Sequence, residues 1–355
     1  MSRLKRMQTL CRRWIKQIVL FMLPLVLFAC SASGQTEQPE TMASDVTTFA
    51  FIGTGNLPPG FDVEGHRGAR GLLPENTLPA FEAALDLGVT TLELDLHFTQ
   101  DGEVVVWHDP IIDDSKCRLP DDPGDPEAPD PRNPLRRIFI SQQPLSVVQS
   151  YRCDLNGDED RFPTQTAVTM PLAGNDYRIV TLAELFDFVE QYATSELKTE
   201  AQRSNAANVQ FNIETKREPD HPEYIDDGFT GGEAGPFELA ILEIVNGRSL
   251  TPRVIIQSFD HRSLRTIREL DSEIRLAALT TGGEAKLDVY AAYKFNIWSP
   301  NQRDVTAELI NKAHDEGLQV IPWTVNETDA MQRLIDWGVD GIITDYPDRL
   351  LGVRS

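Results

Sequence analysis

Residues 91–98 read TLELDLHF, a run in which polar and apolar side chains alternate at every position. Successive side chains of a β-strand lie on opposite faces, so Glu93 and Asp95 share one face and the three leucines share the other. Two carboxylates on one face of a buried strand repel each other unless a cation or a basic partner balances their charge. The run therefore predicts a strand that carries an acidic functional site.

Short apolar runs recur along the rest of the chain and alternate with amphipathic helical stretches, a pattern typical of βαβ units around a parallel sheet. The predicted strands are Val63–His66, Thr91–Phe98, Val209–Thr215, Val254–Phe259, Ile274–Leu279, Phe295–Trp298, Gln319–Thr324 and Gly341–Thr344. Eight such runs indicate an α/β fold, a closed (β/α)₈ TIM barrel, whose active-site residues lie at the C-terminal ends of the strands. We predict this barrel over residues 59–355.

An antiparallel arm and an irregular insertion are predicted directly after the second strand. Residues 103–107 form an extended segment, and the preceding Gln-Asp-Gly at 100–102 is typical of a hairpin turn. Periodicity then disappears over residues 110–178, where proline, aspartate and arginine are concentrated. Long irregular loops are uncommon in compact domains unless they are functional or disordered. We expect this insertion to shape the entrance of a substrate site.

The N-terminus has the organisation of a secretory signal peptide, with a basic stretch through Lys16 followed by an apolar run over residues 18–29. This run is shorter than the roughly 20 residues of a membrane-spanning helix, which favours cleavage. Residues 27–30 resemble a bacterial lipobox. We therefore predict a signal peptide over residues 1–29, with Cys30 as a lipid-modified first residue. The alternatives are an uncleaved anchor and ordinary signal cleavage nearby, and all three place the remaining chain outside the cytoplasm.

Residues 30–58 are predicted to form a flexible tether, because their small and polar side chains offer little burial to offset the entropy of ordering. Of the four cysteines, Cys117 and Cys153 lie beyond the signal and the tether. Cysteines outside the cytoplasm commonly pair, so we predict a disulfide that closes most of the insertion. Two separate free thiols are the alternative.

The formal net charge of the chain is -22, and removal of the basic signal peptide leaves the protein more acidic still. Such a charge repels a phosphate backbone, which supplies the sequence-independent part of nucleic-acid affinity. Nucleic acid is therefore excluded as a partner.

A second alternating stretch strengthens the prediction of an acidic site. Glu214 and Lys216 share one face of the predicted strand at 209–215 and its end. Together with Glu93 and Asp95, Glu214 completes an oxygen-rich group suited to one divalent cation, Ca²⁺ or Mg²⁺. The alternative is a set of internal salt bridges, for example between Glu214 and Lys216.

Two histidines are candidates for proton transfer because each closes an extended segment. His66 ends the first predicted strand and His108 ends the arm. Two imidazoles beside a phosphate can supply one group that takes a proton and one that gives it. Arg67 can hold a phosphate oxygen through its planar fork of donors. The histidines interpreted as surface or core residues are His97, His221, His261 and His314.

An ordered set of motifs from Val63 to the C-terminus resembles the glycerophosphodiester phosphodiesterase family. The motifs are His66-Arg67-Gly68, Pro74-Glu75-Asn76-Thr77, Glu93-x-Asp95, His108-Asp109, Glu214-x-Lys216, Gln257-Ser258-Phe259, Trp323-Thr324-Val325-Asn326 and the run Gly341–Pro347. The resemblance implies a TIM barrel that hydrolyses glycerophosphodiesters to sn-glycerol 3-phosphate and an alcohol with the help of a divalent cation.

The resemblance also implies roles for individual residues. It assigns Glu93, Asp95 and Glu214 to the cation, His66 and His108 to acid/base catalysis, Arg67 and Lys216 to the phosphate, and Phe259 and Trp323 to the substrate pocket. By analogy with the related phosphatidylinositol phospholipases, His66 is expected to be the base and His108 the acid.

Two other functions remain open at this point. One is a phospholipase D-type enzyme of the same fold that acts on intact phospholipid, and the other is a non-catalytic binding lipoprotein. A further pattern, Asp154-x-Asn156-x-Asp158-x-Asp160, imitates the start of a calcium loop but has Gln165 where a glutamate belongs. A solvated acidic turn is the alternative for that segment.

Overall fold

The computed structural model describes residues 46–119 and 138–353 of the chain. The predicted signal peptide, Cys30 and the first part of the predicted tether lie outside these residues. None of the helices within the described ranges has both the length and the apolar character required to cross a bilayer.

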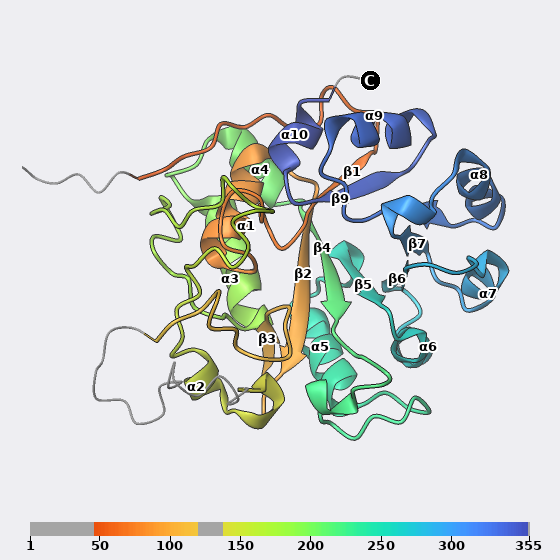
Figure 1. Cartoon of the computed structure of the whole chain (residues 1–355), viewed down its shortest axis with the longest axis horizontal. Helices are drawn as coiled ribbons and strands as arrows, with labels where there is room; N and C mark the ends of the chain where they lie inside the picture. Colours follow the sequence, from red (N-terminus) through yellow and green to blue (C-terminus); the bar gives the residue numbers. More distant parts are fainter. Residues whose placement is uncertain (1–45, 120–137, 354–355) are drawn as a thin grey trace, which may run out of the picture. The chain divides into compact units, whose positions relative to one another are not determined.

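Among the described residues, nine strands form a single sheet in the order β8-β7-β6-β5-β4-β2-β1-β9, with β3 paired to β2 (Figure 1). The strands are β1 (Asp62–Gly65), β2 (Thr91–Phe98), β3 (Val104–Val106), β4 (Gln210–Thr215), β5 (Val254–Ser258), β6 (Arg275–Thr280), β7 (Ile297–Pro300), β8 (Gln319–Val320) and β9 (Gly341–Thr344). All the pairings along this order are parallel, and β3 alone runs antiparallel to its neighbour.

Backbone hydrogen bonds join the two ends of the sheet. The amide of Asp340 donates to the carbonyl of Val320 over 3.0 Å, and the amide of Ile343 donates to the carbonyl of Pro322 over 3.0 Å. These bonds connect the segment at and just after β8 to the segment at and just before β9, so the eight parallel strands form a nearly closed barrel. The predicted (β/α)₈ TIM barrel is therefore confirmed.

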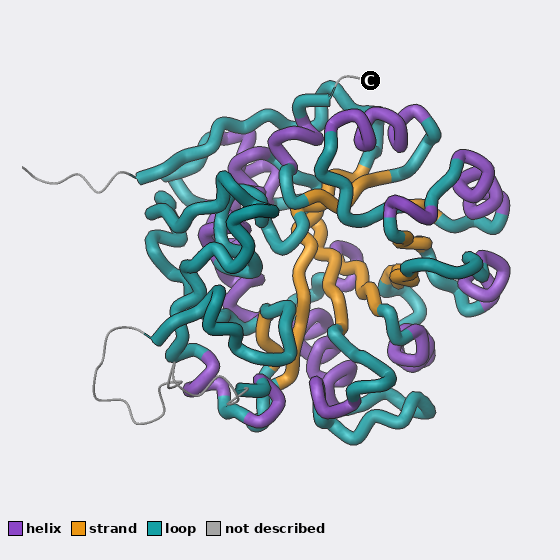
Figure 2. Tube along the Cα trace, in the orientation of Figure 1, coloured by secondary structure: helices purple, strands orange, loops and turns teal. Residues whose placement is uncertain are grey.

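Helices follow every barrel strand and surround the sheet (Figures 1 and 2). They are α1 (Leu78–Leu87), α2 (Leu145–Val148), α3 (Leu182–Thr194), α4 (Glu200–Ala206), α5 (Pro236–Gly247), α6 (His261–Leu270), α7 (Leu287–Ala292), α8 (Ala307–Asp315), α9 (Thr328–Asp336) and α10 (Pro347–Leu351). Helix α1 illustrates how the sequence specifies these elements. Its N-cap Thr77 accepts a hydrogen bond from the amide of Ala80, and Gly88 ends it with a left-handed φ of 93°.

The barrel interior has an apolar side and a polar side. A small apolar cluster is formed by Ile255, Ala277, Ile297, Ile321 and Ile343. On the polar side, Asn212 donates to Glu64 over 2.7 Å and Gln257 donates to Glu93 over 2.8 Å, with Asn212 and Gln257 also in contact. This buried polar chain runs through the barrel towards the C-terminal ends of β2 and β4.

The predicted arm is confirmed as β3, in which Val104 faces Phe98 and Val106 faces Leu96 of β2. One predicted strand is much shorter than expected, because β8 ends at Val320. The strand was predicted to continue to Thr324, but Pro322 has no amide hydrogen to continue a ladder.

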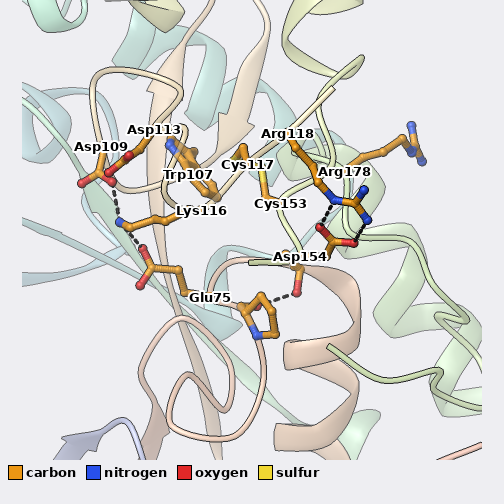
Figure 3. Close-up of a disulfide and its surroundings, with 12 residues drawn as sticks. Glu75, Trp107, Asp109, Asp113, Lys116, Cys117, Arg118, Cys153, Asp154 and Arg178 are labelled. Carbon is orange, nitrogen blue, oxygen red and sulfur yellow. Dashed lines mark hydrogen bonds and ion pairs between the residues drawn. A yellow bond between two sulfur atoms is a disulfide. The ribbon is translucent and has the colours of Figure 1, made fainter. Parts of the chain in front are cut away.

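The described part of the insertion is held together by its own apolar cluster rather than by regular elements, and Figure 2 shows it largely as loops. The cluster is formed by Val105, Trp107, Ile112, Cys117, Ile138, Ile140, Val148, Tyr151, Cys153 and Ile179. Within this cluster Cys117 and Cys153 are joined by a disulfide (Figure 3).

The predicted tether requires a correction for residues 46–58, which contact the barrel. The amide of Thr47 donates to the carbonyl of Thr169, and the amide of Ile52 donates to the carbonyl of Leu87. Leu57 is buried in the core, and Phe49 packs against it. These few apolar side chains pack on the barrel, although the polar composition of the segment as a whole predicted no such contact.

A buried ion cluster connects α1 to the segment before α4. Lys198 lies 2.5 Å from a carboxylate oxygen of Glu82 and 2.6 Å from one of Asp86, which also accepts a hydrogen bond from Tyr192. Burial and the Asp86 carboxylate raise the pKa of the Tyr192 hydroxyl. The Lys198 side chain is only 3% exposed. Its ammonium group is therefore a buried positive charge, and it balances the two buried carboxylates of Glu82 and Asp86.

We expect Lys198→Met to lower the free energy of unfolding by about 3–5 kcal/mol, because it leaves the buried carboxylates of Glu82 and Asp86 without the positive charge that balances them. Urea titration followed by circular dichroism measures this change. Lys312→Met, on the exposed face of α8, is the matched control and should change stability by less than about 0.5 kcal/mol. Equal stability of the two variants would contradict the role of the cluster.

Candidate active site

Three buried carboxylates meet at the C-terminal ends of β2 and β4. Asp95 and Glu214 are register partners on these strands, and Glu93 lies on the same face of β2 as Asp95. One oxygen from each of Glu93, Asp95 and Glu214 lies within 4.8 Å of the other two. Burial and the charges of the other two carboxylates raise the pKa of Glu93 well above its ordinary value. Burial, opposed by Lys216, also raises the pKa of Glu214 to about 7.

The surrounding basic residues balance these carboxylates only in part. The Lys216 ammonium lies 2.8 Å from Glu214 and 3.6 Å from Asp95, and Arg67 Nε lies 3.1 Å from Asp95. The Oδ1 atom of Asp95 is buried and accepts no hydrogen bond. Three converging carboxylates with an unsatisfied oxygen fit a hard divalent cation such as Ca²⁺ or Mg²⁺. The predicted salt bridge of Glu214 with Lys216 is also present, beside this group of carboxylates.

His66 follows β1 directly, and its ring is oriented by a carboxylate. Its Nδ1 atom lies 2.6 Å from Oδ1 of Asp345, which is the residue that follows β9. The carboxylate accepts this hydrogen bond, so Nδ1 carries the proton and Nε2 of the neutral ring is free to take one. Nε2 faces Glu93 at 3.9 Å. Burial lowers the pKa of His66, although Asp345 opposes the shift.

His108 follows β3 and has a similar arrangement with the next residue. Its Nδ1 atom lies 2.7 Å from Oδ1 of Asp109. Burial and the charge of Arg67 lower the pKa of His108 to about 3. His97 lies on β2 beneath it and donates from Nε2 to the carbonyl of His108 over 3.0 Å. His97 was predicted to be a surface or core residue, and it is a buried residue that supports the backbone of His108.

The turn after β1 places Arg67 between the carboxylates. Its backbone amide donates to Glu93 over 2.9 Å, and its guanidinium lies 3.0 Å from Glu75. Arg67 has a φ of 53° and Asn76 a φ of 56°, in a left-handed region that costs energy for residues other than glycine. Asn76 donates to Asp95 over 2.8 Å. Strained backbone at two residues that contact the carboxylate group indicates a functional arrangement.

A cavity of about 280 Å³ opens over this group. The predicted site residues that line it are His66, Arg67, Glu93, His108, Glu214, Lys216, Phe259 and Trp323. Asp95 lies buried below them. Phe259 and Trp323 form an apolar wall, with their rings edge to face and their centroids 5.5 Å apart. The tertiary structure thus gathers residues that are up to 257 positions apart into one pocket.

Sequence reasoning assigned no role to several residues that the structure places in the site. Asp345, Gln257 and Glu75 belong to motifs that were recognised, but their contacts with His66, Glu93 and Arg67 depend on tertiary structure. The sequence feature that could have identified Asp345 is its position directly after a barrel strand. The same criterion, a residue at the C-terminal end of a strand, identified His66 as a candidate site residue. Lys116 gave no such signal, since it lies in the irregular insertion.

The segment that imitates a calcium loop is an acidic turn in the structure. Asp154 pairs with Arg118 and Arg152, and Asn156 donates to the carbonyl of Phe162 over 2.7 Å. The side chain of Asp158 accepts a hydrogen bond from the amide of Arg161. Arginines or backbone groups therefore engage Asp154, Asn156 and Asp158, and the candidate metal-binding group found among the described residues lies elsewhere, at Glu93, Asp95 and Glu214.

The family model described as the glycerophosphoryl diester phosphodiesterase family matches residues 66–349. The chain belongs to this family. The resemblance inferred from the motifs is thereby confirmed, and the chain is a phosphoric diester hydrolase by its membership.

Relatives across the family match nearly the whole barrel. The chain is 26% identical over 299 residues to a glycerophosphodiester phosphodiesterase of Caldanaerobacter subterraneus subsp. tengcongensis, covering 82% of this chain and 96% of that protein. It is 26% identical over 294 residues to a lysophospholipase D of Mus musculus, covering 80% and 83% respectively. A solved structure from Silicibacter pomeroyi DSS-3, assigned as a glycerophosphoryl diester phosphodiesterase, is 27% identical with a TM-score of 0.65 and covers 85% of this chain and 96% of that chain.

Proposed function

We propose that this member of the family hydrolyses glycerophosphodiesters to sn-glycerol 3-phosphate and an alcohol, with the help of one divalent cation. One observation carries the proposal. The carboxylates of Glu93, Asp95 and Glu214 lie within 4.8 Å of one another, and two of them, Glu93 and Glu214, line the same cavity as two imidazoles that are each oriented by a carboxylate. This combination suits the stabilisation of phosphate charge together with two proton transfers.

Glu93, Asp95 and Glu214 would hold the cation, as the unsatisfied oxygen of Asp95 supports. A bound Ca²⁺ or Mg²⁺ supplies positive charge that stabilises the phosphate oxygens during displacement. Arg67 and Lys216 line the same cavity and supply further positive charge to the phosphate. Phe259 and Trp323 provide the apolar wall against which the carbon skeleton of a substrate packs.

The two histidines have different surroundings, which supports different roles. His66 keeps Nε2 free of a proton because Asp345 accepts the hydrogen of Nδ1, so His66 is suited to take a proton from the nucleophile. His108 is more exposed and lies at the arm, where it is suited to give a proton to the departing alcohol. A bound phosphate adds negative charge beside Arg67 and Lys216 and thereby favours the imidazolium form of His108.

The proposal is tested by incubating the purified chain with glycerophosphocholine and measuring released sn-glycerol 3-phosphate. Turnover should disappear with a chelator and return with added Ca²⁺ or Mg²⁺. Release that persists after complete chelation would contradict the cation requirement. If the protein binds glycerophosphocholine without releasing product, it is a non-catalytic binding lipoprotein.

A second candidate is hydrolysis of a lipid substrate of the phospholipase D type, which the mouse relative named lysophospholipase D favours. The same assay distinguishes the two when it includes lysophosphatidylcholine micelles and phosphatidylcholine vesicles. We expect glycerophosphocholine to be the best of the three substrates, because the cavity of about 280 Å³ is lined mainly by charged and polar side chains. A higher kcat/KM on either lipid would favour the second candidate.

We also propose that the protein is an exported lipoprotein, anchored through Cys30 and facing the periplasm or the cell exterior. In a bacterial host, Cys30→Ala should abolish incorporation of radiolabelled palmitate into the protein, because it removes the residue that would carry the lipid. Cys11→Ala, inside the predicted signal, is the matched control and should be labelled as the wild type is. Labelling of Cys30→Ala equal to that of the wild type would contradict the lipid anchor.

A further inference from the structure

Lys116 belongs to the insertion, yet its ammonium lies between the carboxylates of Asp109 and Glu75 (Figure 3). It contacts Oδ2 of Asp109 and lies 2.9 Å from Oε1 of Glu75. The side chain is 20% exposed and lines the same cavity as His108. The insertion therefore contributes a positively charged side chain directly to the site, and this side chain is not part of the family motifs.

The two carboxylates that Lys116 contacts each serve a different part of the site. The other oxygen of Asp109 orients Nδ1 of His108 at 2.7 Å. The Oε1 atom of Glu75 also accepts a hydrogen bond from Arg67 over 3.0 Å. Lys116 thus connects the His108–Asp109 pair to the Glu75–Arg67 pair through a single ammonium group.

The backbone of Lys116 is restrained by the disulfide and the loop that packs on it. The next residue, Cys117, is bonded to Cys153, and the amide of Leu155 donates to the carbonyl of Lys116 over 3.1 Å. Gly157 closes over the lysine stem, where an added Cβ would lie only 2.8 Å from Cγ of Lys116. These contacts hold the lysine in the orientation that reaches both carboxylates.

We propose that Lys116 is a positioning residue of the hydrolysis, and that the Cys117–Cys153 disulfide holds it in place. This inference rests on the proposed function. Lys116 keeps the Asp109 carboxylate turned towards His108 and keeps Glu75 beside Arg67. The insertion is in this way part of the reaction machinery, and its disulfide helps to hold Lys116 in the site.

Loss of the ammonium changes the charge around His108 in a predictable direction. The charged side chains that face His108 are Arg67, Glu75, Asp95, Asp109 and Lys216. Without Lys116, the negative charge of Asp109 is no longer balanced, so protonated His108 is stabilised. The limb of the pH profile that belongs to His108 should therefore move to higher pH.

The test compares Lys116→Met, Lys116→Arg and Lys312→Met in the full chain with glycerophosphocholine. Lys116→Met should lower kcat by about 10-fold or more with little change in KM, since loss of an orienting partner typically costs 10–100-fold in activity. Its pH profile should shift upwards as described. Lys116→Arg should recover most of kcat and the normal profile, and Lys312→Met should behave as wild type.

A double variant, Cys117→Ala/Cys153→Ala, keeps Lys116 and removes only its covalent restraint, and it should reproduce the fall in kcat. Wild-type kcat and pH profile in Lys116→Met would overturn the inference while the proposed function stands. Equal losses in Lys116→Met and Lys116→Arg would also overturn it, because the residue would then be merely structural. Wild-type kcat in the double variant would overturn the role of the disulfide. Inactive wild-type protein would overturn the proposed function and this inference with it.

Discussion

His66→Ala and His108→Ala should each lower kcat on glycerophosphocholine by about 10²-fold or more, the usual contribution of a general acid or base. Each imidazole is held by a carboxylate, Asp345 for His66 and Asp109 for His108, so alanine removes a group that is already oriented for proton transfer. Initial rates of sn-glycerol 3-phosphate release measure the loss, and KM should change far less than kcat.

The exposed histidine His221 offers a matched control, because His221→Ala removes the same chemical group away from the carboxylate cluster. This control should retain wild-type rates. Thermal melting should place all three variants close to wild type, which separates a catalytic loss from unfolding. If either His66→Ala or His108→Ala keeps near-normal kcat, the role assigned to that histidine is wrong.

Removal of the divalent cation should abolish turnover, and Glu214→Gln should weaken cation affinity by about 100-fold or more. Substitutions that merely disturb the partners of a metal ligand already cost 10–100-fold, and Glu214 is expected to contact the cation directly. Titration calorimetry with Ca²⁺ and with Mg²⁺ measures the change. Glu243→Gln, on the exposed side of α5, is the matched control and should bind both cations as wild type does.

Cation affinity should also fall as the pH is lowered through about 7. In the cation-free protein, burial, opposed by Lys216, raises the pKa of Glu214 to about 7, and burial with neighbouring carboxylates raises the pKa of Glu93. Below those pKa values the cation must displace protons, whereas above them the carboxylates are already charged. Affinity that is unchanged between pH 6 and pH 8 would contradict the assignment of Glu214 as a ligand.

Alternation along the chain predicted the barrel correctly, because strand geometry depends on local sequence. The Glu93-x-Asp95 pattern placed two carboxylates on one face, and the positions of His66 and His108 at segment ends placed both in the site. The end of β8 was predicted poorly, since Pro322 has no amide hydrogen with which to continue the ladder. The docking of residues 46–58 was missed because only two apolar side chains of this polar segment, Phe49 and Leu57, pack on the core.

The sequence by itself determined the fold class, the family and most of the residues that meet in the cavity, because hydrophobic periodicity and ordered motifs are local properties of the chain. Only the tertiary structure decided which partner each of these residues has. Asp345 reaches His66 across 279 positions, Gln257 reaches Glu93 across 164, and Lys116 reaches Glu75 across 41. Such pairs form when barrel closure and the disulfide-closed insertion bring distant segments together, and no local pattern encodes that proximity.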